Sequence, residues 1–278
     1  MTRLAEGAEQ IQRKGGSAIK VGCCAYSYRT YLKGDSPLMS VESFLETAAE
    51  MGCDAVELTS YYFPPDFTIE YVNKLKRRAF LLGLDISSTA VGNRFTCPAG
   101  AERDAQMALV KKWIVHASEL GAPCMRVFAG GVPKGSSEQD AMKWVVDGLN
   151  ECAELASRHG VMLALENHGG VTATPDQVLS IMTSVKSDWV GVNLDTGNFH
   201  TEDPYADITK VAPYAVITHF KAEVSAPGKP KEKADVKRIA GILKDAGYRG
   251  YLNLEYEAAE DPKTAVPAII QSMKEAVG

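Results

Sequence analysis

Short apolar segments recur along the chain, and each is followed by a stretch in which apolar residues return with the period of a helix. Eight such segments begin at residues 19, 54, 84, 123, 161, 190, 215 and 251. Successive starts are 25 to 39 residues apart, which is the length of one strand-and-helix unit. Eight units predict an α/β protein with a single (β/α)8 TIM barrel. An open doubly wound sheet is the runner-up, but its glycine-rich GxGxxG turn is absent.

The helical stretches have recognisable ends. Predicted helices cover residues 40–51, 108–120 and 236–246, and a glycine directly follows each of them. A glycine at this place commonly ends a helix because it adopts the left-handed conformation at little cost. No linker or change of composition divides the chain, so we expect one barrel over residues 19–278. Residues 1–18 are expected to be a flexible or helical extension.

Composition and charge narrow the class of protein. The 45% hydrophobic content is typical of a folded soluble chain. A net charge of −5 and a pI near 5.6 argue against a surface that follows the phosphates of nucleic acid. No run approaches the roughly 18 apolar residues of a membrane span, and the polar N-terminus has no signal-peptide core. We therefore expect no nucleic-acid or membrane partner and a cytoplasmic location, although a chain from which a leader had been removed would look the same.

The cysteines form no motif. None of the six belongs to a CxxC pair, and four of them lie in or beside apolar runs. This usage predicts free, reduced thiols in the core and not a zinc site or a disulfide framework. The cysteines are Cys23, Cys24, Cys53, Cys97, Cys124 and Cys152.

Polar side chains gather late in four consecutive predicted strands. In a parallel barrel the side chains alternate between inside and outside, and the active site lies where the strands end. These residues are therefore the ones expected at the site. They are Glu166 and His168 on the fifth strand, Asn193 and Asp195 on the sixth, His219, Lys221 and Glu223 on the seventh, and Asn253, Glu255 and Glu257 on the eighth, with Asn198 and His200 in the loop after the sixth strand.

Three carboxylates and one imidazole in this set predict a metal site. A buried carboxylate is costly unless an opposite charge or a metal compensates it, and several together repel one another. Glu166, Asp195, His219 and Glu255 offer oxygen and nitrogen ligands, which suit one divalent ion such as Mn²⁺, Mg²⁺, Co²⁺, Fe²⁺ or Zn²⁺. For any one of the carboxylates taken alone, the alternative to metal binding is a position on the surface or in an ion pair.

The same segments resemble the sugar phosphate isomerase/epimerase family, which has a xylose-isomerase-like barrel and also contains endonuclease IV. The segments are ALENHGG, NLDTGNF, THFKAE and GYRGYLNLEYE, and the pattern GYxGxxxxE over residues 247–255 is the most specific. The resemblance extends from about residue 20 to the C-terminus. It implies that Glu166, Asp195, His219 and Glu255 bind one catalytic divalent metal, and that the two glutamates are also the acid/base pair.

Two positions depart from better-known members of the family. Ketose 3-epimerases carry a further glutamate six residues after the strand-five ligand, whereas this chain has Thr172. Many members read DxxH in strand six, whereas here the fourth position is Asn198 and a histidine follows only at His200. The generic chemistry is therefore better supported than any named substrate.

Two further residues are predicted to act in catalysis. His168 is two positions after Glu166, so it is expected to face the same cavity, where it could bond a sugar hydroxyl or transfer a proton. Support of the metal ligands is an equal alternative for it. Lys221 could stabilise an enediolate or bind an anionic group, and simple pairing with Glu223 or Glu255 is its alternative.

Other residues are predicted to contact the substrate. Arg126 and Glu57 would form a buried ion pair, for which a structural role is the first interpretation. Tyr61 lies in the segment SYYFPP after the second strand, where it could stack on a pyranose ring or simply pack. Asn198 and His200 complete the predicted substrate-binding set.

The predicted chemistry is proton abstraction next to a carbonyl. A cation would polarise the carbonyl, one glutamate would remove the proton, and the other could return it. This favours an isomerase or epimerase acting on a small sugar or keto-sugar. A lyase or dehydratase acting on a keto-glycoside or inosose would use the same metal and base.

Two other classes of protein are less favoured. An endonuclease IV-like enzyme needs a three-zinc cluster with additional histidines, and two of the five here, His116 and His159, fall in helical patterns. A non-catalytic sugar-binding barrel would need no metal ligands. Barrels of this family often associate, which implies that a homo-oligomer can form.

Overall fold

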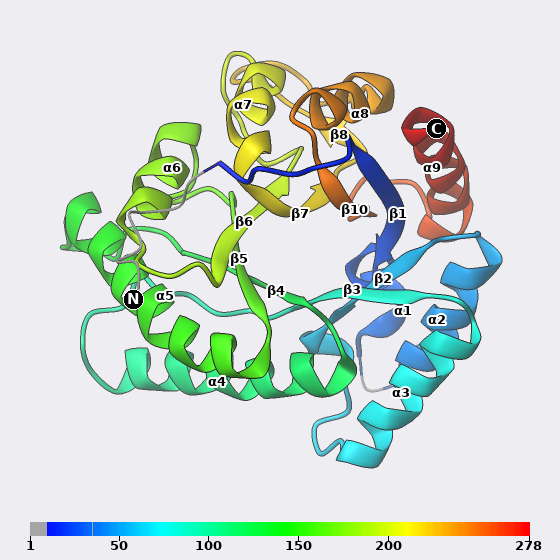
Figure 1. Cartoon of the computed structure of the whole chain (residues 1–278), viewed down its shortest axis with the longest axis horizontal. Helices are drawn as coiled ribbons and strands as arrows, with labels where there is room; N and C mark the ends of the chain where they lie inside the picture. The colour runs from blue at the N-terminus through cyan, green and yellow to red at the C-terminus, as the bar shows by residue number, and fades with distance from the viewer. Residues whose placement is uncertain (1–9, 35) are drawn as a thin grey trace.

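Eight parallel strands close into a barrel in a computed structural model that describes residues 10–34 and 36–278 (Figure 1). Each barrel strand pairs with the next one along the chain, and the last pairs with the first. The closed ring confirms the predicted (β/α)8 barrel. Its strands are β1 Ala18–Cys24, β2 Ala55–Thr59, β3 Asp85–Ala90, β4 Cys124–Val127, β5 Met162–Glu166, β6 Val190–Asp195, β7 Ala215–Phe220 and β10 Arg249–Leu254.

Helices surround the ring of strands (Figure 1). They are α1 Arg29–Leu32, α2 Val41–Glu50, α3 Ile69–Leu81, α4 Ala101–Leu120, α5 Glu138–His159, α6 Pro175–Ser184, α7 Pro204–Val211, α8 Val236–Asp245 and α9 Pro262–Val277. Short 3-10 turns lie at Ala25–Tyr28, Ser60–Tyr62 and Ala212–Tyr214, and a small antiparallel hairpin joins β8 Glu223–Val224 to β9 Glu232–Lys233. None of the helices in the described part of the chain is long and apolar enough to cross a membrane.

The predicted helix ends agree with the structure except at one start. Ser40 caps α2, since its hydroxyl accepts a hydrogen bond from the Ser43 amide at 3.2 Å. Gly121 follows α4 in the left-handed conformation, with a φ of 79°. However, α4 begins at Ala101, seven residues before the predicted start at 108. Its first turns are mostly exposed and polar, so they show no apolar period, and the first buried residue of the helix is Met107.

The interior of the barrel changes character along its axis. Near the beginnings of the strands it holds a small apolar cluster of Cys124, Ala164 and Ile217. Two residues further along each of these strands stand Arg126, Glu166 and His219, all buried. Because alternate residues of a strand face inward, the inward-facing side chains of these strands change from apolar to charged toward the mouth of the barrel. All six cysteines are buried and free, as predicted.

The described part of the N-terminal extension lies along the beginnings of the strands. The Ile11 amide donates to the Pro213 carbonyl at 3.0 Å, and the Arg13 guanidinium donates to the carbonyl of Ala215, the first residue of β7. The Ser17 hydroxyl reaches the Tyr248 carbonyl at 2.6 Å. Residues 10–17 are thus an irregular segment fixed by hydrogen bonds, and residues 1–9 of the predicted extension lie outside the described residues.

Candidate active site

The four predicted metal ligands meet at the mouth of the barrel. Glu166 ends β5, Asp195 ends β6, His219 lies near the end of β7, and Glu255 directly follows β10. One ligand atom of each lies within 4.8 Å of the ligand atoms of the other three. All four side chains are buried. The structure therefore brings together three carboxylates and an imidazole in a space from which water is largely excluded.

One oxygen of this group has no hydrogen-bond partner. Oδ1 of Asp195 accepts a hydrogen bond from the Gly197 amide at 2.8 Å, but Oδ2 is buried with none among the described residues. The nearest cation, the Lys221 ammonium, is 3.6 Å from Oδ2. A buried carboxylate oxygen without a partner is costly, and a bound cation would satisfy it. The residues present thus fit a divalent metal by their chemistry as well as by their convergence.

Amide and guanidinium groups surround Glu166. Asn198 donates to Oε1 at 3.0 Å, Asn193 donates to Oε2 at 3.2 Å, and Nε of Arg126 is 3.1 Å from Oε2. Burial raises the pKa of Glu166 to about 7, with Arg126 opposing this shift and Glu255 adding to it. Burial likewise raises the pKa of Asp195 to about 7.

Glu255 has a different environment. The Lys221 ammonium is 2.5 Å from Oε2 of Glu255 and 2.5 Å from Oε2 of Glu257. Burial opposes the charge of Glu255, but Lys221 and His219 outweigh it and lower the pKa of Glu255 well below its usual value. Burial also opposes the charge of Lys221, whose pKa is nevertheless raised well above its usual value by the carboxylates around it.

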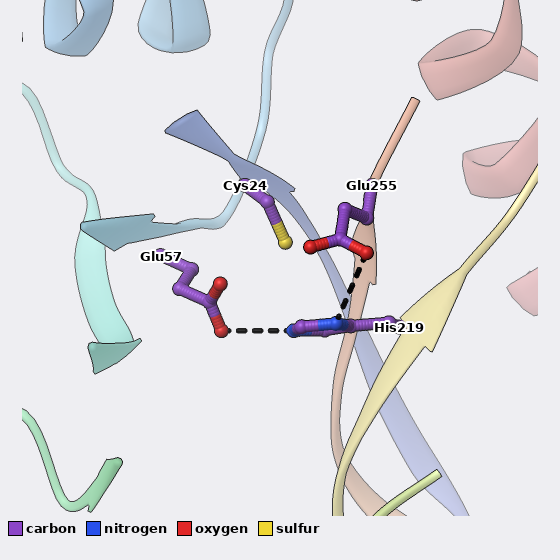
Figure 2. A group of neighbouring side chains, drawn as sticks. All are labelled: Cys24, Glu57, His219 and Glu255. Carbon is purple, nitrogen blue, oxygen red and sulfur yellow. Dashed lines mark hydrogen bonds and ion pairs between the residues drawn. The ribbon is translucent and has the colours of Figure 1, made fainter. Parts of the chain in front are cut away.

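His219 lies between two sets of carboxylates. Its Nε2 is 2.9 Å from Oε2 of Glu57, and its Nδ1 is 3.7 Å from Oε2 of Glu255 (Figure 2). Nδ1 is also 3.8 Å from Oε2 of Glu166. Burial opposes a charge on the ring, but Cys24 and the carboxylates of Glu57 and Glu255 raise the pKa of His219 well above its usual value. This shift shows how strongly the surroundings favour a positive charge here, which a metal ion would also supply.

The structure corrects the predicted pair of Arg126 and Glu57. Arg126 is paired with Glu166, while Glu57 is paired with His219. The reason is the strand order, because β4 is the direct neighbour of β5 and is separated from β2 by β3. The Arg126 guanidinium is also held by the Val91 carbonyl at 3.0 Å.

Alternation along a strand fails as a guide beyond the strand's last residue. β5 ends at Glu166, and His168 is an exposed side chain whose ring lies 4.4 Å from that of Phe128. Partial burial and the nearby Arg126 lower the pKa of His168. β7 ends at Phe220, so Glu223 belongs to the β8 hairpin strand, where its carboxylate is 3.5 Å from the Lys231 ammonium. The prediction that Glu223 lies on the same strand as His219 is therefore wrong.

The remaining predicted residues lie at the rim. Asn198, His200, Lys221 and Glu257 line a recess of about 150 Å³ beneath the β8–β9 hairpin. His200 itself contacts Ser225, with 2.8 Å between Nδ1 and Oγ. Tyr61 is 45% exposed after β2, as expected of a residue in a loop at the mouth.

Sequence reasoning missed Ser88, which contacts the site through Glu57. Its hydroxyl donates to Oε2 of Glu57 at 2.7 Å. The pairing of β2 with β3 shifts register between Val56 and Glu57, which brings Ser88 opposite Glu57. A bulge of this kind changes which side chains face inward, and the run of two serines carries no signal of it.

Several known proteins are similar to this chain in sequence or in fold. The family described as xylose isomerase-like TIM barrel matches residues 45–276. The L-ribulose-5-phosphate 3-epimerase of Escherichia coli is 25% identical over 245 residues, covering 80% of this chain and 84% of the relative. The solved 3-keto-D-glucoside 4-epimerase of E. coli has a TM-score of 0.74 at 16% identity, covering 93% of this chain and 100% of that one. The IOLI protein, solved with a bound zinc atom, has a TM-score of 0.74 at 18% identity, covering 92% and 96%.

Proposed function

The chain belongs to the xylose isomerase-like TIM-barrel family, and from this premise we propose that it is a divalent-metal-dependent isomerase or epimerase of a sugar or keto-sugar. The observation that carries the proposal is the buried quartet of Glu166, Asp195, His219 and Glu255 with its unpartnered Asp195 oxygen. The relatives support the reaction class, because a curated relative and a structural neighbour are both named epimerases of sugars.

The metal would be held by the same quartet. Its donor set of carboxylate oxygens and one imidazole nitrogen suits Mn²⁺, Mg²⁺, Co²⁺ or Zn²⁺, and a neighbour of the same fold is described with bound zinc. When bound, the metal would polarise a substrate carbonyl and stabilise the negative charge that develops on its oxygen. All other steps belong to side chains of this chain.

The two glutamates would move the proton. One carboxylate takes the proton from the carbon next to the carbonyl, and the bonding electrons pass to the carbonyl oxygen to give an enediolate. The other carboxylate returns a proton to the same carbon from the opposite side, which inverts it. Before a metal binds, burial raises the pKa of Glu166 to about 7, whereas Lys221 lowers the pKa of Glu255, so the two carboxylates differ in how readily they hold a proton.

The surrounding residues would bind and orient the sugar. Lys221 contacts Glu255 and could also donate a hydrogen bond to an oxygen of the enediolate. His168 and Tyr61 present rings at the rim, where a sugar can stack. Asn198 and His200 line the polar recess beside Lys221, so we assign them to substrate hydroxyl groups.

A lyase that acts on a keto-glycoside or inosose is the second candidate. The observation that favours it is the Lys221 ammonium, which lies 2.5 Å from both Glu255 and Glu257. An ammonium beside Glu255 could donate a hydrogen bond to an oxygen that leaves from the carbon beyond the enediolate. Such an enzyme would share the first proton abstraction and differ only in the departing group.

The test is proton exchange followed by NMR in D₂O. The metal-loaded protein, with diamagnetic Mg²⁺ or Zn²⁺, is incubated with ketoses, ketose phosphates, inososes and 3-keto-glycosides. We expect deuterium at the carbon next to the carbonyl, and the product distinguishes epimerisation from elimination.

Two variants control this measurement. Glu166→Gln should abolish the exchange from at least one epimer of each active substrate. Glu151→Gln, which removes a carboxylate that binds Arg103 and Lys111 on the outside of the barrel, should leave it intact. If metal is bound and no substrate of the panel exchanges, the proposed proton transfer is wrong.

A further inference from the structure

We propose that Glu57 is a positioning residue that holds the His219 ring with its Nδ1 directed at the metal site, an inference that rests on the proposed function. Glu57 lies on β2 and His219 on β7, on different sides of the barrel interior, and neither side chain is exposed. Oε2 of Glu57 is 2.9 Å from Nε2 of His219 (Figure 2).

The Glu57 carboxylate is itself fixed in place. The Ser88 hydroxyl on β3 donates to the same Oε2 at 2.7 Å. Ser88, Glu57 and His219 thus form a chain of contacts that crosses the interior from β3 to β7. A ring held in this way cannot turn about its side-chain bonds without breaking a buried hydrogen bond.

The contacts of the ring select one tautomer. A neutral imidazole has one N–H donor and one acceptor nitrogen. An N–H on Nε2 donates to Glu57, and Nδ1 then faces the side-chain amide of Asn193, 3.1 Å from Nδ2. The same Asn193 amide donates to Oε2 of Glu166, so its N–H groups point at two acceptors. Nδ1 therefore carries the lone pair, on the side of Glu166 and Glu255.

This arrangement is what a metal-binding histidine requires. Such residues commonly donate their second ring N–H to a carboxylate, which fixes the tautomer and makes the other nitrogen a better ligand. The burial of Glu57 also argues against the substrate contact that the sequence predicted. Its Oε2 accepts from Ser88 and contacts His219, and its Oε1 is buried without a hydrogen-bond partner among the described residues.

A second grouping competes for the metal. Cys24, Glu57, His219 and Glu255 also have ligand atoms within 4.8 Å of one another, and Glu57 faces the Nε2 side of the His219 ring (Figure 2). Each group contains one buried carboxylate oxygen without a hydrogen-bond partner among the described residues, Oε1 of Glu57 in this group and Oδ2 of Asp195 in the other. We assign the metal to the other group, because its carboxylates and imidazole suit Mn²⁺ and Mg²⁺, whereas a thiol suits softer metals. The two groups differ in their dependence on Cys24, which the experiment below uses.

The test is the affinity of the full-length, metal-stripped protein for Mn²⁺ alone, measured by titration calorimetry. Glu57→Gln should weaken Mn²⁺ binding by about 10- to 100-fold, as loss of a carboxylate behind a metal-bound histidine typically does. Glu57→Asp, which keeps the charge, should recover part of the affinity. In protein labelled with ¹⁵N-histidine, at a pH high enough for the His219 ring to be neutral, its signals should show the Nε2–H tautomer in the wild type and a mixture of tautomers in Glu57→Gln.

The controls separate the alternatives. Glu151→Gln removes an ion-paired carboxylate outside the barrel and should bind Mn²⁺ like the wild type. Cys24→Ser should also retain the affinity, and loss of binding in Cys24→Ser with retention in Glu166→Gln would put the metal on the Nε2 side and overturn the inference. Should Glu57→Gln fail to fold, Ser88→Ala removes only the second bond to the carboxylate and should still weaken binding a few-fold.

Failure of this inference can be told from failure of the proposed function. If Glu166→Gln loses Mn²⁺ binding while Glu57→Gln keeps both the affinity and the single tautomer, the role of Glu57 is wrong and the metal site stands. If the wild type binds no divalent metal, the proposed function itself fails.

Discussion

The two sides of the barrel mouth hold their glutamates in opposite ways. On the β5 side, Glu166 receives hydrogen bonds from two asparagine amides and faces the buried Arg126, and its pKa is about 7. On the β10 side, Glu255 binds the ammonium of Lys221, and its pKa is well below the usual value. Glu166 and Glu255 have the same predicted role, but their neighbours shift their pKa values in opposite directions.

The first way to test this comparison is to remove each glutamate separately. Glu166→Gln and Glu255→Gln should each lower the rate of epimerisation by about 10²- to 10⁴-fold, the usual contribution of a general acid or base. If the glutamates act on opposite faces of the substrate, each variant should still exchange the proton of one epimer with D₂O. Loss of exchange from both epimers in both variants, with metal still bound, would contradict the division of roles. Proton NMR started from each epimer is the measurement.

The second test removes the partner of Glu166. Arg126→Met leaves a buried carboxylate without its guanidinium, so the free energy of unfolding should fall by about 3–5 kcal/mol. Arg103→Met is the matched control, because Arg103 is 24% exposed in its pair with Glu151 and should cost less than about 1 kcal/mol. Urea unfolding measures both. An equal cost for the two variants would mean that the Arg126 pair is not the buried contact described here.

The third test is the pH dependence of stability without metal. Glu166 and Asp195 have folded-state pKa values of about 7, above their ordinary 4.5 and 3.8, so the folded state binds more protons than the unfolded state between these values. Stability from these groups is therefore greatest at low pH and is lost as the pH rises toward 7. Glu255, whose pKa is lowered, acts in the opposite sense and loses its contribution as the pH falls below 4.5.

We therefore expect the Tm of the EDTA-treated protein to fall from pH 5 to pH 7.5, and Glu166→Gln to reduce that slope. Adding Mn²⁺ should raise the Tm increasingly at higher pH, since a metal requires deprotonated ligands. Differential scanning fluorimetry provides the measurement. If the Tm of the metal-free protein rises over this pH range, burial does not raise the pKa values of Glu166 and Asp195.

The smallest effect is expected at Glu257. Its carboxylate is 2.5 Å from Lys221, as that of Glu255 is, but its side chain is 40% exposed. Solvent screens such a pair, so Glu257→Gln should change the free energy of unfolding by less than about 1 kcal/mol. Steady-state kinetics should change by only a few-fold. A loss comparable to that of Glu255→Gln would show that Lys221 needs both carboxylates to be positioned.

The sequence predicted the features that depend on the order of the strands and on the alternation of side chains along each strand. The eight apolar segments indicated the barrel, and the last inward residues of β5 to β7, with the residue after β10, indicated the quartet. It did not predict the features that depend on where a strand ends or where the pairing of two strands shifts register. His168 and Glu223 were extrapolated past strand ends, and Ser88 became visible only through the bulge beside Glu57. Partners such as Arg126 and Glu166 follow from contacts across neighbouring strands, which one sequence alone does not encode in any local pattern.

The pairing of the first strand with the last has a consequence for synthesis of the chain. Ala18 is opposite Arg249, and helix α9 lies beside β1 (Figure 1). The ring therefore closes only through contacts between residues more than two hundred positions apart, which are slow to form. Glu255 follows the strand that closes it, so a nascent chain still attached to the ribosome near this point has no complete site. The four predicted metal ligands therefore come together only after β10 has left the ribosome.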